Sequence, residues 1–474
     1  MQLYEPQGIK NLEDKMASYE DLVRNLFFAA RQSAAQSFKS NIRKRLDYYH
    51  DRQLPYLEEL IRQQFVHADP LAVQPHFFNI VKPIVNETAM IYRSGARRTL
   101  VSPDGEVDPA VQRLWQAIQN WSRYDAVMKT VNRMVNLCGT VLVRPAFRQN
   151  RIKLDIITPD LVDVIPAEDD PTEAEGIAYT RPNPDRTAPF SYIIHYWDSE
   201  RYLKFTPNGD IIRDPDNPDG INPYGVLPFV RFVNQLPTDS FFVRAGDDLI
   251  IAQDNINIKL TQLNYLVKMQ SFSIPVLRGY QGPDRITISP GKPIVIPLGT
   301  IGQGEPDFRF ETPHPQIGEL IKLLEHEIIR IFRAYGIGSA DFSLQGEVKS
   351  GFALVMENLK LLESRENELP FYEDAEEELF EVIKRVWNYH SRFLPAGHPF
   401  RGVRIPEEVR LRVSVNDISL PKPAGEEIAE WKFMLQNRLA TPIDFLMRRY
   451  KLSESEARER WEEIRKWWEE NLPG

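Results

Sequence analysis

The stretch VKSGFALVMENLKLL, residues 348–362, joins a polar loop to the first turns of a long helical pattern. Apolar residues keep helical spacing from Gly351 to about Phe393, and Pro370 is the one interruption. Because proline lacks a backbone N–H and its ring clashes with the preceding turn, we expect a kink there. A helix of about forty residues rarely serves a small core, so this stretch predicts a large fold built along one long helix.

Two shorter helical patterns come before the polar loop. In residues 247–272 apolar side chains step by three or four positions and form one stripe, which indicates an amphipathic helix. The second pattern begins at Pro315 and ends at Gly336, where a glycine after the last turn is expected. Between them, residues 273–314 carry many prolines and glycines and short β-branched runs, which predicts a small β insertion. The stripe consists of Leu249, Ala252, Ile256, Leu260, Leu263 and Val267, and the polar residues across from it are Asn255, Asn257, Lys259 and Gln262.

The polar loop DFSLQGEVKSG, residues 341–351, has the composition of an enzyme lid, a phosphate-holding loop or a loop that contacts material in a pore. The motif G-x-x-x-x-G-K-[ST] is absent from the chain, and GEVKSG lacks the glycine before its lysine that a phosphate nest needs. A nucleotide site in this loop is therefore excluded.

The N-terminal half adds helices and then a β region. Residues 1 to about 66 have a helical pattern, and their basic run NIRKRLDYYHDRQ, residues 41–53, is typical of a solvated helix face. Two further helical patterns cover residues 77–91 and 110–137. Residues 138–235 contain short strand patterns bounded by Gly, Pro, Asn or Asp, which predicts an antiparallel β region.

The C-terminal part begins with a strand pattern, VRLRVSV, residues 409–415. One helix is predicted to begin at Pro442, and another after the capping box SESE at residues 453–456. That last helix carries more apolar surface than a lone surface helix uses, so its side chains either pack locally or form a subunit interface. They are Trp461, Ile464, Trp467 and Trp468.

Composition limits the classes of protein. A chain of 474 residues exceeds the roughly 250–300 residues at which a single core stops growing, so we expect two or more domains. The chain has 58 Lys and Arg residues against 67 Asp and Glu residues, a net charge of −9. This balance argues against a protein that binds DNA by neutralising its phosphates, but not against one that handles DNA without gripping it. The single cysteine, Cys138, excludes an internal disulfide framework.

The sequence has no targeting or membrane signal. No apolar run approaches the roughly 20 residues of a membrane span, and the N-terminus lacks the apolar core of a signal peptide. We therefore expect a cytosolic protein with no membrane partner.

Residue patterns typical of catalysis are missing from the sequence. The histidines include no H-x-x-x-H pair, and no G-x-S-x-G motif is present. The acidic run AEDDPTEAE, residues 167–175, lacks the ligand spacing of a calcium loop, and the carboxylates of EDAEEE, residues 373–378, are spread around a helix. We expect no enzyme activity, no catalytic residue, no metal and no cofactor.

The order of these parts resembles the portal (head-to-tail connector) proteins of tailed double-stranded DNA phages, closest to the siphophage-type branch. The similarity runs from about Arg43 to the C-terminus and rests on this order: helical and β region, helix, β insertion, helix, loop, long helix. Five stretches add to it, the last of them similar to the SG-x-A-L start of the long helix after the tunnel loop of that family. They are RKRLDYYHDRQ, NIVKPIVNETAMIYRSG, ITPDLVDVIPAEDD, NPYGVLPFVRF and VKSGFALVMENLKLL.

The resemblance implies an α+β fold, mainly helical, with a wing, a stem, a clip and a crown arranged around the long kinked helix. We expect the clip strands to pair across subunits, because so short a segment does not form a stable independent sheet. The expected boundaries are 1–240 and 351–420 for the wing, 241–272 and 315–336 for the stem helices, 273–314 for the clip, 337–350 for the tunnel loop and 421–474 for the crown.

Site residues follow from the same resemblance. One tunnel loop per subunit would project into an axial channel and meet DNA, with Lys349 as the best candidate to guide the phosphates. The DNA-facing loop residues would be Asp341, Gln345, Glu347, Val348 and Lys349. The possible channel-facing stem residues are Lys259 and Lys268, and the residues for docking the motor on the clip are Asp284, Arg285, Lys292 and Glu305.

The function implied is a structural ring, a dodecamer in the family, placed at one capsid vertex of the virion and assembled in the host cytoplasm. Its partners would be itself, double-stranded DNA without sequence preference, the terminase large subunit, the major capsid or scaffolding protein and a head-completion adaptor. Two alternatives remain open: a minor capsid or adaptor ring protein, which should lack this order of parts, and a metal-dependent nucleic-acid-processing enzyme whose carboxylates the fold brings together.

Overall fold

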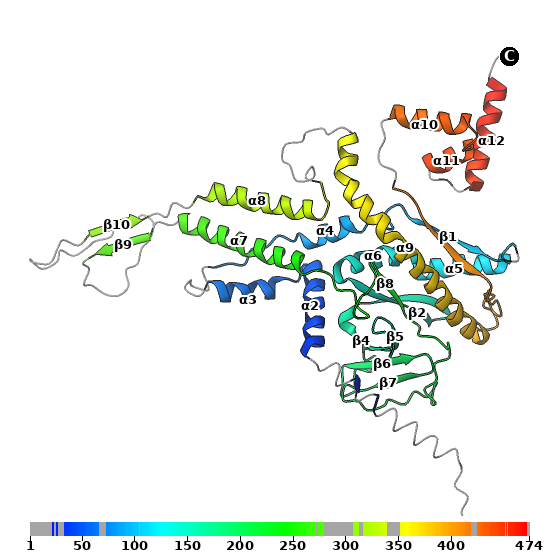
Figure 1. The fold of residues 1–474 in the computed structure, drawn as a ribbon, viewed down its shortest axis with the longest axis horizontal. Helices are drawn as coiled ribbons and strands as arrows, with labels where there is room; N and C mark the ends of the chain where they lie inside the picture. The colour runs from blue at the N-terminus through cyan, green and yellow to red at the C-terminus, as the bar shows by residue number, and fades with distance from the viewer. Residues whose placement is uncertain are drawn as a thin grey trace, which may run out of the picture. The chain divides into compact units, whose positions relative to one another are not determined.

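The computed structural model describes twelve segments of the chain, and they divide into two compact units, Met1–Leu344 with Leu359–Asn416 and Gln345–Asn358 with Asp417–Gly474. Figure 1 shows the elements. The described residues are 21–22, 25–26, 33–65, 73–103, 105–271, 274–278, 307–311, 316–338, 351–418, 424–450, 452 and 454–471. The elements are α2 (Ser33–Tyr49), α3 (Leu54–Gln64), α4 (Val81–Thr88), β1 (Ala96–Val101), α5 (Pro109–Ser122), α6 (Tyr124–Cys138), β2 (Thr140–Arg148), β3 (Arg151–Ile157), η1 (Pro159–Leu161), β4 (Val162–Pro166), β5 (Ala174–Pro182), β6 (Tyr192–Asp198), β7 (Tyr202–Phe205), β8 (Val230–Val233), α7 (Asp248–Ser271), β9 (Ile274–Arg278), β10 (Asp307–Glu311), α8 (Ile317–Ala334), α9 (Gly351–His390), η3 (Ser391–Phe393), β11 (Arg410–Val415), α10 (Ala424–Gln436), α11 (Pro442–Tyr450) and α12 (Glu454–Asn471).

The long helix predicted from the sequence is α9, a single helix of 40 residues that continues through Pro370. From Leu359 onward it belongs to the first unit, where one face is completely buried in the main core. Helices α4 to α6, strands β2 and β8 and strand β11 contribute to the same core. The mainly helical α+β class with one long helix is therefore confirmed. The buried residues of α9 include Tyr372, Leu379, Phe380, Ile383, Val386 and Trp387.

Two antiparallel sheets occupy the predicted β region, residues 138–235, as expected. One has the strand order β3-β2-β8 and the other β4-β5-β6-β7. Strand β2 is buried along most of its length because it lies in the centre of its sheet and packs against α6. A third pairing joins distant parts of the chain, since β1 runs antiparallel to β11 with Ala96 opposite Val415.

Gly139 fixes the position of the chain that leads into α7. Its φ is +86°, and a Cβ atom there would lie 2.3 Å from the carbonyl oxygen of Val243 and 2.7 Å from the nitrogen of Ala245. The next residue, Thr140, accepts a hydrogen bond from the Val243 N–H at 2.8 Å and donates one to its carbonyl at 3.0 Å. Only glycine allows this close approach of two backbone segments.

The helical pattern over residues 110–137 forms two helices, α5 and α6, where one was predicted. Arg123 interrupts them with a left-handed conformation, φ +52°. The helix expected over residues 77–91 is limited to α4, and residues 73–80 before it are not helical. Both differences arise because tertiary contacts override the apolar spacing.

Helices α7 and α8 flank the strands β9 and β10, which pair with each other in antiparallel fashion. Each of the two strands keeps one outer edge, and pairing of the clip strands across subunits stays a prediction. Helix α8 ends as predicted: Gly336 has φ +74°, and the N–H of Ile337 donates to the carbonyl of Phe332 at 3.0 Å.

The second unit contains α10, α11 and α12. Trp431 packs edge-to-face against Phe445, with ring centroids 5.1 Å apart. Thr441 caps α11, because its hydroxyl accepts the Asp444 N–H and its own N–H donates to the Asp444 carboxylate. On α12, Trp467 and Trp468 contact each other but are each more than half exposed. Local packing therefore covers them only in part.

Candidate functional site

Helices α7 and α8 lie side by side (Figure 1), and polar contacts join them at two levels. The ammonium of Lys259 on α7 pairs with the carboxylate of Glu327 on α8 at 2.5 Å. Nearer the start of α7, the Tyr335 hydroxyl donates to Asp248 Oδ2 at 2.8 Å. The pair is thus one structural element held at defined register.

Arg45 of α2 fixes the entry into α7. Its guanidinium is buried and donates to the carbonyl oxygens of Leu137, Ala245 and Gly246 at 3.3, 3.0 and 2.8 Å, and it pairs with Asp247 at 2.5 Å. A buried charge is tolerated only when its donors are satisfied in this way. These contacts hold helix α2, the end of α6 and the start of α7 together, and we call this anchored region the root.

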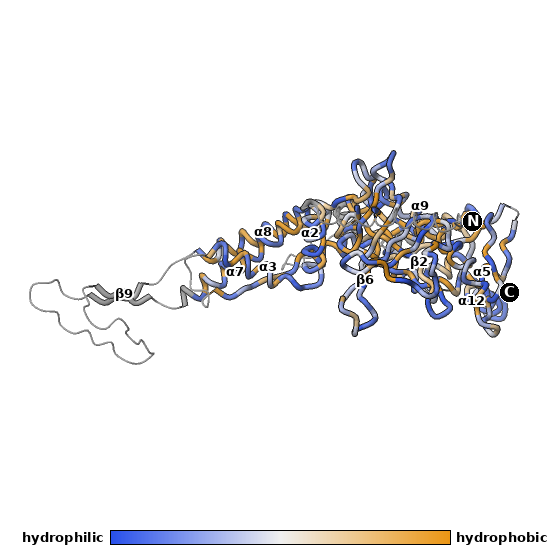
Figure 2. The backbone as a smooth tube through the Cα atoms, turned by 90° about the horizontal axis from the view of Figure 1, so that it is seen from below, coloured by the Kyte–Doolittle hydropathy of each residue, from blue (hydrophilic) through white to orange (hydrophobic). Residues whose placement is uncertain are grey.

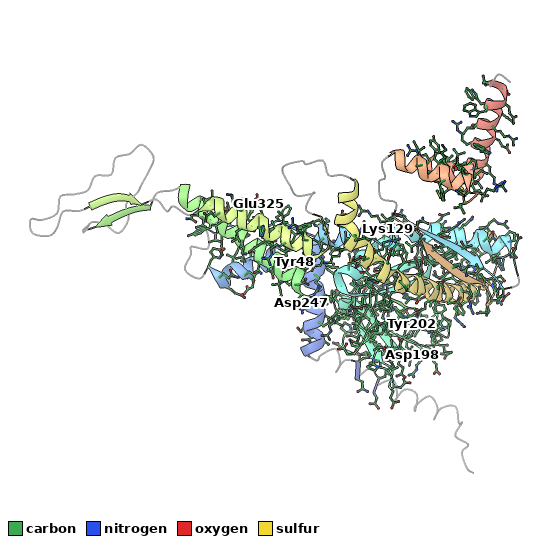
Figure 3. All side chains as sticks on the ribbon, turned by 45° about the horizontal axis from the view of Figure 1, so that its top comes forward. Tyr48, Lys129, Asp198, Tyr202, Asp247 and Glu325 are labelled. Carbon is green, nitrogen blue, oxygen red and sulfur yellow. The ribbon has the colours of Figure 1, made fainter. Side chains whose placement is uncertain are left out.

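A second anchor of the root is Asp254, one turn along α7. Lys44 pairs with its carboxylate at 2.8 Å, and the Tyr48 hydroxyl donates to the other carboxylate oxygen. Burial, together with that hydrogen bond, raises the pKa of Tyr48, so the phenol stays protonated. Figure 3 shows Tyr48 and Asp247 close to the start of α7.

The prediction that residues 41–53 form a solvated basic face is therefore wrong for Lys44 and Arg45, although Arg43 remains mostly exposed. The signal that would have revealed it is spacing. Arg45 lies three residues after Ile42 and four before Tyr49, both buried, and so falls on the apolar face of α2.

Polar residues at four-residue intervals on α7 hold the extended segment 73–80. Gln253 accepts the N–H of Ile80 at 2.7 Å and donates to the carbonyl of Phe78 at 2.8 Å. Two turns later, Thr261 accepts the N–H of His76 at 3.1 Å and donates to its carbonyl at 3.2 Å. The segment binds through its backbone, as a strand would.

Asn257 lies between these two contacts and is fully buried. It accepts a hydrogen bond from Gln253 and donates one to Gln53, both at 2.7 Å. Asn257 thus differs in burial from Asn255 and Gln262, the other uncharged polar residues predicted across from the apolar stripe, which are exposed. Sequence alone does not distinguish an exposed asparagine from one inside a hydrogen-bond network.

The outer half of the α7/α8 pair exposes apolar side chains. Figure 2 shows hydrophobic residues along both helices. A pocket of about 350 Å³ opens between them beside Phe65, with walls that are mainly leucine. Exposed patches of this kind mark protein interaction surfaces. The large apolar residues exposed on the two helices are Ile251, Val267, Leu320, Ile321 and Leu323.

The charges of the two helices balance. Asp248 and Asp254 on α7 stand against Lys259 and Lys268, and α8 adds three acidic and three basic residues. Duplex DNA carries one charge per about 1.7 Å, so a strongly basic wall would hold it at each step of movement. Because the net charge of the α7/α8 pair is near zero, a channel wall built from it would neither hold nor repel DNA strongly.

Of the predicted site residues, the structure describes Lys259 and Lys268 only. Lys259 is engaged with Glu327, and Lys268 is exposed in the last turn of α7. The others lie outside the described residues: Asp341, Gln345, Glu347, Val348 and Lys349 of the tunnel loop, and Asp284, Arg285, Lys292 and Glu305 of the clip.

Titratable groups inside the β region have structural partners. Burial, with a contribution from the nearby Arg144 and Lys204 charges, lowers the pKa of His195 to about 3. Its ring stacks on Tyr179 and lies 3.0 Å from the Tyr202 hydroxyl. Within the described residues, no group of three or more His, Cys, Asp or Glu side chains is placed to hold a metal ion.

No helix in the described part of the chain is both long enough and apolar enough to cross a membrane.

Comparison with known proteins gives one family match. The sequence model described as "Phage portal protein, SPP1 Gp6-like" matches residues 36–394. No curated protein sequence matches the chain.

Similar solved structures come from gene transfer agent particles. One is from the virion of a native particle, with 14% identity, a TM-score of 0.38 and coverage of 78% of this chain and 88% of that chain. Another is from the neck of an empty particle computed with C6 symmetry, with 13% identity, a TM-score of 0.40 and coverage of 82% and 91%. A third, from the neck of a native particle computed with C12 symmetry, has 13% identity, a TM-score of 0.36 and coverage of 80% and 86%.

Proposed function

This chain belongs to the phage portal protein family of the SPP1 Gp6-like type, and on that premise we propose that its copies close into the ring through which double-stranded DNA passes at one vertex of the virion. The family is structural, so the ring serves as a channel and a docking platform. Membership in it favours the portal over a minor capsid or adaptor protein.

One observation carries the ring: the α7/α8 pair is anchored to its own chain at the start of α7 but leaves Val267, Leu320 and Leu323 exposed farther out. A neighbouring copy that packs against this surface would bury it. A contact between two different surfaces closes into a ring when its rotation permits. The resulting stem would consist of α7 and α8 from every subunit, with near-zero net charge toward the DNA.

The remaining parts take their roles from this arrangement. Residues 337–350 form the tunnel loop that meets the duplex, with Lys349 as its cationic guide, and residues 273–314 form the clip that docks the terminase motor. The wing, residues 1–240 and 351–420, faces the capsid or scaffolding protein. Residues 421–474 form the crown, and a head-completion adaptor binds the ring after packaging.

The ring is tested on the purified chain. Mass photometry and negative-stain microscopy at micromolar concentration should show closed rings with a central hole, and we expect about twelve subunits as in the family. Monomer alone at micromolar concentration and at several salt concentrations would contradict the proposal.

The channel role of the loop is tested by Lys349→Glu, with Lys349→Gln as its matched control. Added negative charge in every subunit repels phosphates, so packaging yield should fall for the first variant and recover in part at higher salt. Rings should form normally in both variants. Loss of rings in the Glu variant would place the loop at a subunit interface instead.

A further inference from the structure

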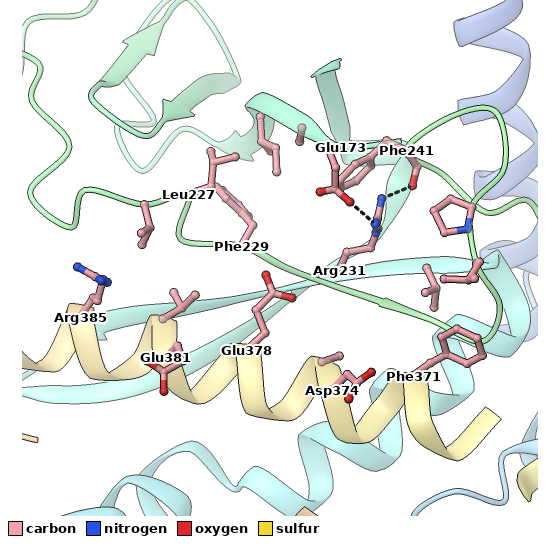
Figure 4. A pocket seen from close by; sticks show the side chains of 18 residues that line it. Glu173, Leu227, Phe229, Arg231, Phe241, Phe371, Asp374, Glu378, Glu381 and Arg385 are labelled. Carbon is pink, nitrogen blue, oxygen red and sulfur yellow. Dashed lines mark hydrogen bonds and ion pairs between the residues drawn. The ribbon is translucent and has the colours of Figure 1, made fainter. Parts of the chain in front are cut away.

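A cleft of about 570 Å³ opens in the first unit between helix α9 and strand β8 (Figure 4). Its apolar part is lined by Phe229 just before β8, Val233 of β8 and Val382 of α9. Leu236 belongs to the same lining and is 71% exposed. A large, mostly exposed leucine beside a cleft is favourable only when something covers it.

Carboxylates line the helical side of this cleft. Asp374, Glu378 and Glu381 follow one another at four- and three-residue spacing, so they share one face of α9. Glu381 pairs with Lys384 and Arg410 at 2.9 and 2.8 Å. Asp374 and Glu378 have no ion-pair partner among the described residues, and desolvation by the cleft walls raises the pKa of Glu378.

No cation of the cleft forms an ion pair with these two carboxylates among the described residues. The charge of Arg231 acts on Glu378, but its guanidinium pairs with Glu173 at 3.1 Å and donates to the Phe241 carbonyl at 3.3 Å (Figure 4). Arg385 lies at one end of the cleft. The cleft therefore presents apolar surface and two free negative charges.

A basic surface lies elsewhere in the same unit, on the two-stranded ribbon formed by β1 and β11. Burial alternates along both strands, so one face packs on the core and the other is exposed. The exposed face carries no acidic residue. It consists of Arg97, Thr99 and Val101 from β1 and Arg410, Arg412 and Ser414 from β11.

Two arginines of that ribbon face are free. Arg410 reaches its own chain's Glu381, but Arg97 and Arg412 have no ion-pair partner among the described residues. They come from neighbouring strands, with Thr99 opposite Arg412 and Arg97 opposite Ser414. Arg97 and Arg412 are therefore diagonal neighbours across the two strands, roughly 7–8 Å apart, which is close to the separation of two residues one helical turn apart, such as Asp374 and Glu378.

The ribbon contacts α9 mainly on the side away from Asp374 and Glu378. It meets the helix through Glu373, which accepts the Val415 N–H, and through Glu376, which pairs with Arg98. At 100° per residue these two positions lie about 150° around the helix from Asp374 and Glu378. Within its own chain the ribbon reaches the edge of the cleft through the Arg410–Glu381 pair, but among the described residues Arg97 and Arg412 do not pair with Asp374 or Glu378.

We propose that the β1–β11 ribbon of one subunit docks on the α9/β8 cleft of the next, with Arg97 and Arg412 against Asp374 and Glu378. The proposal rests on the proposed ring and names a contact that sets its direction. Because the ribbon and the cleft are two different surfaces, their contact is head-to-tail and propagates around a ring. Ribbon arginines would neutralise the free carboxylates, and Val101 would cover part of the exposed leucine.

Charge reversal tests the contact. Asp374→Lys with Glu378→Lys, or Arg97→Glu with Arg412→Glu, should each raise the concentration needed for half-assembly about tenfold or more, because like charges then face each other. All four changes in one chain should restore assembly. Matched controls are Asp219→Lys and Arg186→Glu, exposed residues away from both surfaces, which should assemble like the wild type.

Cross-linking gives a second test that does not depend on the effects of charge on folding. The native thiol, Cys138, is fully buried, so Glu378→Cys with Arg412→Cys introduces the only reactive pair. A short bismaleimide should yield a ladder of covalent dimers, trimers and larger species, and neither single variant should do so. Rings without a ladder would overturn the contact alone, whereas a ladder without closed rings would keep the contact and contradict the ring.

Discussion

The two halves of helix α7 belong to different kinds of structure. In the first half, Gln253, Asn257 and Thr261 are fully buried and hydrogen-bonded to the chain's own backbone or side chains. In the second half, Gln262 and Val267 face solvent, and the neighbouring surface of α8 exposes Leu320 and Leu323. One helix thus passes from a region completed by its own chain to a region that needs another chain.

That difference separates two uses of polar residues. Polar side chains inside the root specify position, because each buried donor or acceptor must meet one particular partner. Apolar side chains outside the root stabilise a contact when they are buried, but they do not require one particular partner group. Mutations in the root should therefore change folding of the single chain, and mutations in the outer half should change assembly.

The largest effect on stability is expected from Arg45→Met. The variant leaves the carbonyl oxygens of Leu137, Ala245 and Gly246 without their donor, which should lower the free energy of unfolding by about 3 kcal/mol. Chemical denaturation monitored by far-UV circular dichroism measures the change. Arg43→Met, two residues earlier and mostly exposed, should change it by less than about 0.5 kcal/mol. Equal effects would show that α2 is not the anchor of the root.

A smaller effect is expected from Asn257→Leu. The substitution keeps the number and branching of the side-chain heavy atoms but removes the partner of Gln53 and Gln253, and we expect a loss of about 2 kcal/mol. Hydrogen exchange should show faster opening of residues 73–80, which the network holds. Asn255→Leu, on the exposed face, serves as the control and should leave both quantities unchanged. A stable Asn257→Leu variant would mean that packing alone positions the segment.

For the outer half, Leu320→Ser with Leu323→Ser should change the stability of the single chain by no more than about 1 kcal/mol, since both side chains are already exposed. Ring yield, measured by mass photometry, should nevertheless fall sharply. Leu324→Ser provides the contrast, because that side chain is buried and its loss should cost about 3 kcal/mol before any assembly occurs. Normal ring yield from the double variant would move the subunit contact away from this face.

The smallest effect is expected at the junction of the two halves, where Lys259 pairs with Glu327. Both side chains are partly exposed, so Lys259→Met should cost roughly 0.5 kcal/mol at low salt and less at 0.5 M salt. Thermal melting at the two salt concentrations resolves the difference. A salt-independent loss of several kcal/mol would show that the pair belongs to the buried root.

Sequence reasoning predicted the elements whose signals are periodic. The long helix, the amphipathic α8 with its terminal Gly336 and the antiparallel strands of residues 138–235 all follow from spacing and turn residues. It failed where tertiary contacts decide. In the sequence, Arg45, Asn257 and Thr261 look like ordinary polar surface residues. Their hydrogen-bond partners are carbonyl and amide groups that come close only in the folded chain. The sequence places the carboxylates of residues 373–378 around the whole helix and predicts no site there. The cleft is not visible in the sequence because its opposite wall, β8, lies some 140 residues away along the chain.

The close approach of two backbone segments at Gly139 limits which substitutions the sequence can accept at that position. Any side chain at that position would collide with the backbone of Val243 and Ala245, just ahead of the residues that Arg45 holds. Gly225 and Gly402 also have positive φ, but a Cβ atom at either would meet nothing within 4 Å. We therefore expect that, in a library of all single substitutions selected for phage growth, no substitution of Gly139 is recovered. Asn and Asp should be recovered at positions 225 and 402. The position of the stem would then depend on the hydrogen atom that glycine carries in place of a side chain.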